Sequence, residues 1–323
     1  MKVENFDKKY LTDVVELWNE AVAKETFYKP FTNEIFTKKF LENKFFENEG
    51  FKLLFDGDKL VGFGHGIVND NDAHPGFITC VVVREGYRRQ GLGSKILSLL
   101  EEYILGKGKK LIRLFFLNPI NLEWFVPGTK ADHPNAAGIA YNTPFYFLLL
   151  ANGYNTRTQE DTYYVDITTY EIPEKVLQRE KENAKDGYNI TLYDPEKHHG
   201  FKELFIDGLN NPGWYQTVKA NLAMENPDPM LIAEKDGEIV GWTGPMHNEP
   251  SGRGYFAGIG VHPKTQGRGL GKSLFCHLCD ESRKNGAKFM TLFTGSTNPA
   301  RNIYLSAGFK VIQSFATMYK EFK

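Results

Sequence analysis

Two segments of this chain carry the same glycine-rich turn between a predicted strand and a predicted helix. They lie at positions 83–94 (VREGYRRQGLGS) and 261–272 (VHPKTQGRGLGK), and a shift of 178 residues superposes them. In both, an apolar run precedes the turn, and apolar residues at helical spacing follow it. A repeat of this size constrains the fold, because each copy must build the same strand, turn and helix.

The segments upstream of the two turns also follow one order. Each copy begins with a short predicted strand and two helical stretches, followed by a hairpin. The hairpins close at Asp-Gly pairs that end at Gly57 and Gly237, a specific hairpin signal. We therefore expect an α/β (α+β) chain with domains at 1–168 and 187–323 and a polar linker at 169–186.

The composition excludes several functional classes. Lys and Arg number 39 and Asp and Glu number 40, so the net charge of −1 gives no electrostatic basis for binding nucleic acid or an anionic membrane. Three cysteines are too few for a disulfide framework and are typical of a reducing compartment. No apolar run approaches the roughly 18 residues of a membrane span. We therefore expect a cytoplasmic protein without a nucleic-acid or membrane partner.

Both glycine turns have the composition of an anion site. Backbone N–H groups at the start of a helix are free to bind, the helix dipole favours negative charge, and glycines allow close approach of a phosphate. Residues 88–93 and 266–271 therefore suit a pyrophosphate, although a tight strand-to-helix connection explains a single such turn equally well. Neither the GxxxxGK[ST] loop of nucleoside triphosphatases nor the GxGxxG of dinucleotide folds is present.

A strand, then Arg/Gln-x-x-Gly-x-Gly, then a helix resembles the acetyl-coenzyme A motif of the GNAT superfamily of N-acetyltransferases. The second copy also carries the family's later motif, at residues 298–309 (NPARNIYLSAGF). The resemblance implies two tandem GNAT-like domains. Each would be a mixed, mostly antiparallel sheet flanked by helices, with a splayed pair of strands that binds the coenzyme.

The resemblance also assigns residues to acetyl-coenzyme A. In the family the pyrophosphate binds the amides of the turn, and the pantetheine arm pairs with the end of the preceding strand. Asn298 and Asn302 stand at later family positions near the coenzyme, although Asn298 suits a helix cap equally well. The implied coenzyme residues are Ile259, Gly260, Val261, Gln266, Gly267, Arg268, Gly269, Leu270, Gly271, Lys272, Asn298 and Asn302 in the second copy, and Val81, Val82, Val83, Arg88, Arg89, Gln90, Gly91, Leu92, Gly93 and Ser94 in the first.

The resemblance implies direct attack of an amine on the thioester carbonyl, which needs a base for the amine and an acid for the departing thiolate. Tyr304, four residues before Gly308, stands at the family's position for the acid; packing against the sheet is the alternative role. Residues 254–261 contain no carboxylate, so Glu249 and His247 are the nearest candidates for the base, each more typical of a solvated surface group. We expect an N-acetyltransferase acting on a primary amine of a small molecule or peptide.

The first copy departs from this pattern. Leu149 stands four residues before Gly153, where the tyrosine is expected. The interval from the turn glycine to the helix-end glycine is 62 residues in the first copy and 39 in the second, which leaves an insert at 118–144. The insert could close the first site as a lid, remodel it for another acceptor, or brace the domains. Asp72 and His74, before the strand, are the first copy's weak candidates for a base.

Aromatic side chains are the candidates for an acceptor site, although hydrophobic closure explains them equally well. These residues are Phe27, Tyr28, Trp124 and Trp214. Cys276 and Cys279 lie within a predicted amphipathic helix and have no further ligands at suitable spacing, so we expect no metal site. A non-catalytic acyl-coenzyme A sensor is the alternative function, because no base stands on the strand before the second turn.

Overall fold

The computed structural model describes residues 1–25, 27–71, 73–141 and 143–323. It contains two compact units. The N-terminal unit comprises Met1–Thr162 and Ile312–Lys323, and the C-terminal unit comprises Tyr163–Val311. Over the described ranges, no helix has the length and apolar character needed to span a membrane.

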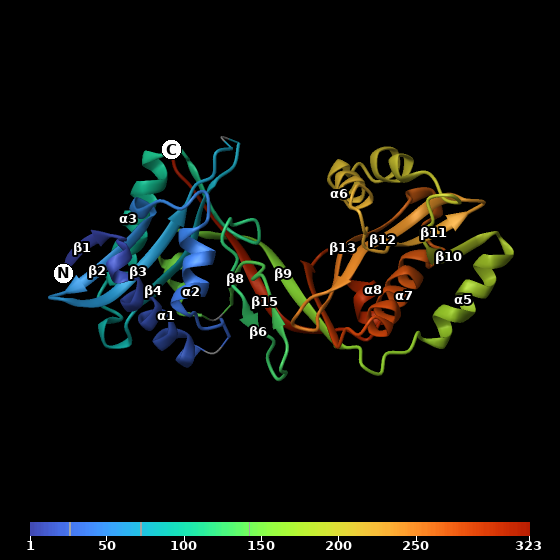
Figure 1. Ribbon diagram of the computed structural model, residues 1–323. Helices are drawn as coiled ribbons and strands as arrows, with labels where there is room; N and C mark the ends of the chain where they lie inside the picture. Colours follow the sequence, from blue (N-terminus) through green and yellow to red (C-terminus); the bar gives the residue numbers. More distant parts are fainter. Residues whose placement is uncertain (26, 72, 142) are drawn as a thin grey trace. The chain divides into compact units, whose positions relative to one another are not determined.

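The N-terminal unit is built on a sheet in the order β1-β2-β3-β4-β5, continued by β15 and β9. The strands are β1 (Lys2–Asn5), β2 (Phe51–Asp56), β3 (Lys59–Ile67), β4 (Gly76–Val83), β5 (Leu111–Leu114), β9 (Asn155–Asp166) and β15 (Lys310–Glu321). The helices are α1 (Leu11–Glu25), α2 (Asn33–Phe36), α3 (Leu92–Gly106) and α4 (Pro144–Ala151). Helices α1 and α3 cover opposite faces of this sheet, each over its own apolar cluster (Figure 1).

A glycine on β3 lets α3 lie close to the sheet. A side chain at Gly64 would come within 2.6 Å of Ile96 and 3.0 Å of Leu100, both on α3. Both helix residues are fully buried. The close approach packs α3, which begins where the first glycine turn ends, directly against β3.

The end of the chain completes the N-terminal unit. Residues of β15 pair antiparallel with β5, with Met318 opposite Leu114 and Glu321 opposite Leu111. The compact units therefore differ from the expected domains, since residues 312–321 lie within the range 187–323 but belong to the N-terminal unit.

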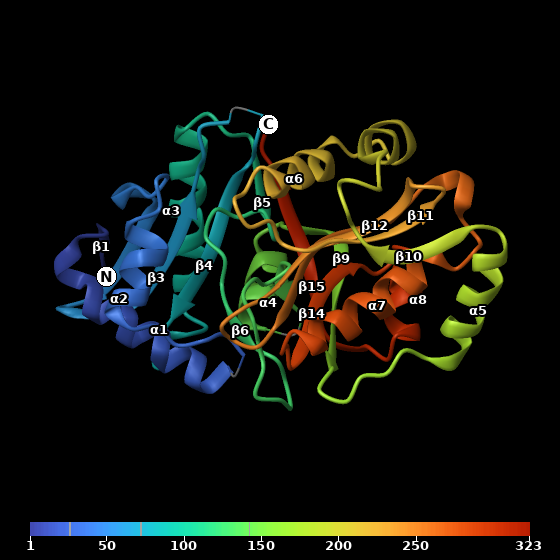
Figure 2. The same cartoon turned by 45° about the vertical axis from the view of Figure 1, so that its right-hand side comes forward.

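The C-terminal unit contains a four-stranded antiparallel sheet in the order β10-β11-β12-β13. The four strands of this sheet are β10 (Tyr188–Leu192), β11 (Leu231–Lys235), β12 (Glu238–Asn248) and β13 (Gly254–Val261). The unit also contains β14 (Phe289–Gly295), which pairs with β9. Its helices are α5 (Glu174–Lys185), α6 (Pro212–Leu222), α7 (Leu270–Lys284) and α8 (Arg301–Ser306). Figure 2 shows α6 on one side of this sheet and α7 on the other.

Each unit contains a pair of neighbouring parallel strands that separate after a short contact. Strands β4 and β5 pair only at Gly76–Ile112 and Phe77–Arg113. Arg253, directly before β13, forms a parallel bridge with Phe289 of β14, and within the described ranges no further pairing joins these two strands. The expected fold class, with its splayed strand pair, is confirmed.

Regular structure occurs in two stretches where the sequence analysis predicted no helix or strand, the insert and the expected linker. The insert forms three two-residue strands, β6 (Trp124–Phe125), β7 (Asp132–His133) and β8 (Ile139–Ala140). Most of the stretch expected as a linker is helix α5, which begins after Pro173 and contacts β10 and α7. Proline at this position suits a helix start, because its missing N–H would be unpaired there.

Candidate functional site

The first glycine turn opens onto a cleft of about 680 Å3 in the N-terminal unit. Gly91 has a φ of 80°, a left-handed conformation that favours glycine, and α3 begins at the next residue. The cleft lies between the turn, the end of β4 and helix α4. It brings together all the coenzyme residues expected in this copy except Gln90, whose Nε2 donates to Gly86 O at 3.4 Å.

The second turn repeats this backbone in the C-terminal unit. Gly267 and Gly269 have φ values of 83° and 80°, and α7 begins at Leu270. Within the described residues, the backbone N–H groups of 269–271 and of 91–93 donate no hydrogen bond. Free N–H groups at a helix start form an anion site, so both turns suit a pyrophosphate.

Helix α5 holds the second turn from behind. Arg179 donates from Nε to Arg268 O (3.2 Å) and from Nη2 to Gly267 O (3.4 Å), and Asn183 donates from Nδ2 to Arg268 O (3.0 Å). Arg268 in turn donates to Asp186 (2.6 Å). These contacts use the carbonyl side of the turn and leave its N–H groups free. Sequence reasoning missed this support; the only signal was helical spacing of apolar residues in a Glu/Lys-rich stretch.

The expected asparagines of the later motif lie in different environments. Asn298 accepts from Ala300 N (3.0 Å) and donates to Thr294 Oγ1 (2.9 Å), so its amide stabilises the turn before α8. Asn302 is exposed on α8. The strand residues Ile259, Gly260 and Val261 form the end of β13 next to the second turn.

Tyr304 lies on α8 with 6% of its surface exposed. Its ring packs on Phe275 of α7 (4.9 Å between centroids) and on Tyr163 (5.6 Å). Burial raises the pKa of Tyr304 to about 12, so the phenol is protonated at neutral pH. In the N-terminal unit the matching position, Leu149, is fully buried.

Glu249 is held by an ion pair. Arg253 donates from Nε and Nη2 to the two oxygens of the Glu249 carboxylate, at 2.8 and 2.5 Å. Arg253 is 7% exposed and donates a third hydrogen bond to Thr291 O (3.1 Å). Arg253 therefore occupies both carboxylate oxygens of Glu249.

His247 forms a pair with Asp228. Its Nδ1 lies 2.7 Å from Asp228 Oδ2, and its ring stacks on Tyr255 at 4.6 Å. The side chain of Asn221 fixes the backbone of Asp228 twice, donating to its carbonyl (2.8 Å) and accepting from its N–H (3.0 Å). Among the described residues, Nε2 of His247 has no hydrogen-bond partner. Asp228 was not foreseen, because a loop aspartate carries no sequence signal.

The His247–Asp228 pair lies on the α6 face of the sheet. His247 and Tyr255 are register partners on β12 and β13. Phe256 packs on Phe275 of α7, so alternation along β13 directs Tyr255 to the opposite face. Trp214 of α6 covers β13 on that same face.

The aromatic candidates for an acceptor site differ in accessibility. Phe27 and Tyr28 are half-buried and line a hollow beside the first cleft. Trp124 is fully buried and donates to Asn135 O (3.1 Å). Trp214 covers β13 so closely that a side chain at Gly258 would come within 2.7 Å of it.

Cys276 and Cys279 are buried in the core of the C-terminal unit, and no group of possible metal ligands is found among the described residues. His74 lies on the surface and contacts Asn69 and Asn71. Asp72 lies outside the described residues.

Comparison with known proteins places both repeats in one family. The acetyltransferase (GNAT) family matches residues 15–123 and 191–309. A protein named mycothiol acetyltransferase from Thermobispora bispora is 26% identical over 269 residues, 80% of this chain and 79% of that protein. The tandem arrangement of the two repeats also resembles that of mycothiol synthase.

Two solved structures share the fold. A GCN5-related N-acetyltransferase from Sphaerobacter thermophilus superposes with a TM-score of 0.64 at 14% identity, covering 99% of this chain and 95% of that one. A tandem GNAT protein from the clavulanic acid biosynthesis pathway gives 0.55 at 14% identity, covering 99% and 98%.

Proposed function

This chain belongs to the GNAT family of acetyltransferases and is an acyltransferase, and we propose that its C-terminal half, residues 187–323, acetylates a primary amine of a small molecule or peptide. One observation carries the proposal: a glycine turn with free N–H groups and the buried phenol of Tyr304 occur in the same unit. The similarity to a mycothiol acetyltransferase supports a small-molecule acceptor.

The residues of the second turn fit acetyl-coenzyme A, which the family generally uses. The N–H groups of 269–271, with the cations of Arg268 and Lys272, suit its pyrophosphate. The end of β13, at 259–261, offers a strand edge to the pantetheine arm, because β14 has already separated from it. When bound, the coenzyme supplies the acetyl group as a thioester.

Two side chains would move the protons. His247 accepts at Nε2 the proton that the amine nitrogen loses as its bond to the acetyl carbon forms. Asp228 accepts the Nδ1–H and so fixes the tautomer with a free Nε2. Tyr304 donates the proton that the sulfur gains as the carbon–sulfur bond breaks. Glu249, tied to Arg253, has no part in this proposal.

Non-catalytic acyl-coenzyme A binding is the second candidate, and one observation favours it for the N-terminal half. The first turn and its cleft of about 680 Å3 suit the coenzyme, but Leu149 replaces the acid. In this alternative the N-terminal half binds acetyl-coenzyme A without turnover.

Release of coenzyme A with a panel of amines tests the proposal. We expect Tyr304→Phe to lower kcat about 100- to 1000-fold, the usual contribution of a general acid, without loss of acetyl-coenzyme A binding. Tyr146→Phe, on the corresponding helix of the N-terminal unit, is the control and should retain wild-type turnover. Equal turnover in Tyr304→Phe would exclude the phenol as the acid. Coenzyme binding without release for any amine would favour the sensor.

A further inference from the structure

A line of three hollows follows β4 in the N-terminal unit. The coenzyme cleft shares Val81 and Val82 with a second hollow of about 60 Å3. That hollow shares Tyr28 and Thr79 with a third of about 30 Å3, called here the inner pocket. At roughly 10–15 Å3 for each water, the last two together have room for about six waters, the size of a small organic molecule.

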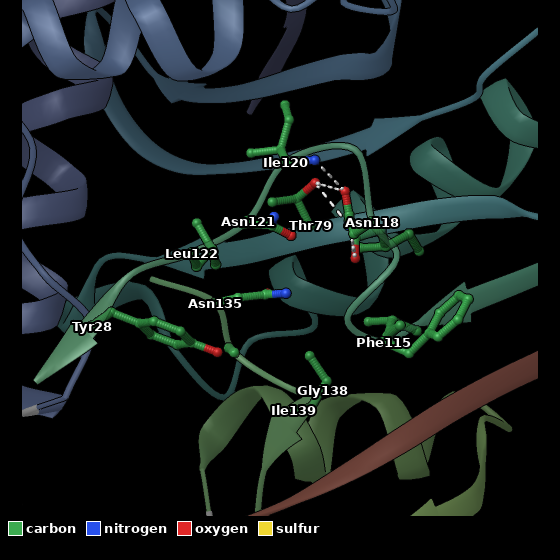
Figure 3. Close-up of a pocket in the computed structure, with 13 residues that line it drawn as sticks. Tyr28, Thr79, Phe115, Asn118, Ile120, Asn121, Leu122, Asn135, Gly138 and Ile139 are labelled. Atoms are coloured by element: carbon green, nitrogen blue, oxygen red, sulfur yellow. Dashed lines mark hydrogen bonds between the residues drawn. The ribbon is translucent and has the colours of Figure 1, made fainter. Parts of the chain in front are cut away.

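The insert forms most of the inner pocket (Figure 3). Eight of its 13 lining residues belong to the insert, and the others come from β4, β5, Phe115 and Tyr28. Backbone hydrogen bonds attach the insert on both sides of Tyr28, from Phe125 N to Phe27 O (2.7 Å) and from Lys29 N to Glu123 O (3.0 Å). The second repeat lacks the insert, so this pocket is particular to the N-terminal unit.

The described residues that line the inner pocket and the hollow beside it are all uncharged. Among the described residues, no Asp, Glu, Lys, Arg or His lines the inner pocket or the hollow beside it. His65 lies behind Thr79, with Nδ1 2.9 Å from the hydroxyl oxygen, and burial lowers the pKa of His65 to about 3, so the ring is neutral. A protonated amine would lose its hydration here without gaining a carboxylate partner. The pocket therefore disfavours cations.

Tyr28 and Asn135 are two of the polar side chains that line the pocket and have hydrogen-bonding atoms to spare (Figure 3). In the described part of the chain, the Tyr28 hydroxyl has no partner, and burial raises the pKa of Tyr28, so it is a donor. Asn135 uses Nδ2 to reach Phe116 O (3.2 Å), which leaves its Oδ1 as an acceptor. Asn118 is already engaged, since it accepts from Ile120 N (2.9 Å) and donates to strand β4. A donor and an acceptor that line one small pocket match an amide group.

We propose that the inner pocket, together with the hollow beside it, binds a small uncharged molecule bearing an amide or hydroxyl group. Its carbonyl or hydroxyl oxygen accepts from the Tyr28 hydroxyl, and its N–H or O–H donates to Asn135 Oδ1. This ligand differs in class from the amine proposed for the C-terminal half. The inference rests on the N-terminal unit alone, so it holds or fails independently of acetyl transfer.

Two small molecules that share a two-carbon skeleton and differ in charge test the proposal. N-(2-hydroxyethyl)acetamide is uncharged, and ethanolamine is protonated at neutral pH. Each is titrated into the full chain in the presence of coenzyme A and followed by ligand-observed NMR. We expect saturable binding of the neutral probe, weakened about three- to tenfold in Tyr28→Phe, the effect of one hydrogen bond. Tyr215→Phe, an aromatic substitution on α6 of the C-terminal unit, is the matched control and should bind it as the wild type does.

Three results would overturn the proposal. The first is no saturable binding of the neutral probe to wild-type protein that still binds coenzyme A. The second is displacement of the neutral probe by ethanolamine at similar concentrations. The third is unchanged binding in both Tyr28→Phe and Asn135→Leu. Tyr28→Phe keeps the ring, and its thermal unfolding separates loss of the hydroxyl from loss of the fold.

Discussion

The two units hold the same glycine turn in different surroundings. Gly91 and Gly269 both have a φ of 80°, and both precede a 15-residue helix. In the N-terminal unit the turn opens onto a wide cleft, whereas in the C-terminal unit α5 holds its carbonyls. Leu149 stands in one unit where Tyr304 stands in the other. The two units thus share the backbone conformation of the turn but differ in the side chain at the position proposed for the acid.

The largest expected effect comes from substitutions that block the proposed pyrophosphate site of one glycine turn at a time. Gly269→Glu places a side chain on left-handed backbone, which costs about 1–2 kcal/mol, and sets a carboxylate where the pyrophosphate is proposed to bind. We expect acetyl-coenzyme A affinity of the C-terminal half to fall at least about 100-fold, with loss of turnover. Calorimetric titration of acetyl-coenzyme A measures the binding, and coenzyme A release measures the turnover.

Gly91→Glu is the matched substitution in the other unit. It should remove coenzyme binding there and leave turnover intact. If Gly91→Glu abolished turnover while Gly269→Glu preserved it, the roles assigned to the two units would be reversed. Thermal unfolding of both variants shows whether the fold survives the strain.

The next largest effect on turnover is expected from replacing the proposed base, His247. His247→Gln removes the proton acceptor, and we expect kcat to fall about 10- to 100-fold, because water can relay part of the proton transfer. The loss should shrink as pH rises, since the amine then loses its proton without help. Asp228→Asn should give a smaller loss with the same pH trend, because it disturbs only the orientation of the ring. A pH–rate profile parallel to that of the wild type in His247→Gln would contradict a role as base.

Local patterns predicted much of this fold. The hairpin glycines and the helix after each turn follow from short stretches of sequence, whereas the splayed strands were implied by the resemblance to the GNAT superfamily. The residues that complete each site could not be predicted, because long-range packing brings them there. Arg179 reaches the second turn from 88 residues away, and Asp228 meets His247 only through the register of two strands and a loop. Trp124, a candidate for substrate contact, is instead fully buried, since the insert packs against the segment around Tyr28.

A smaller effect is expected from removing the hydrogen bonds that α5 donates to the carbonyls of the second turn. Arg179→Ala removes two hydrogen bonds to the turn carbonyls, and Asn183→Ala removes a third. The turn then becomes less ordered before binding, so we expect the double variant to weaken acetyl-coenzyme A binding to the C-terminal half about three- to tenfold. The KM for acetyl-coenzyme A should rise while kcat stays near wild type. A change in kcat alone would mean that α5 acts on the chemistry rather than on the turn.

The smallest effect on turnover is expected at Glu249, and it separates the two candidates for the base. Glu249→Gln leaves the 7% exposed Arg253 without its carboxylate, so the free energy of unfolding should fall by about 1–2 kcal/mol. Turnover measured below the unfolding temperature should stay within about twofold of wild type, because Arg253 holds the carboxylate and Glu249 has no part in the proposed proton transfers. Denaturant unfolding and coenzyme A release give the two values. A large loss of kcat with unchanged stability would assign the role of base to Glu249 instead of His247. The amine acceptor would then bind near the start of β13, beside Arg253.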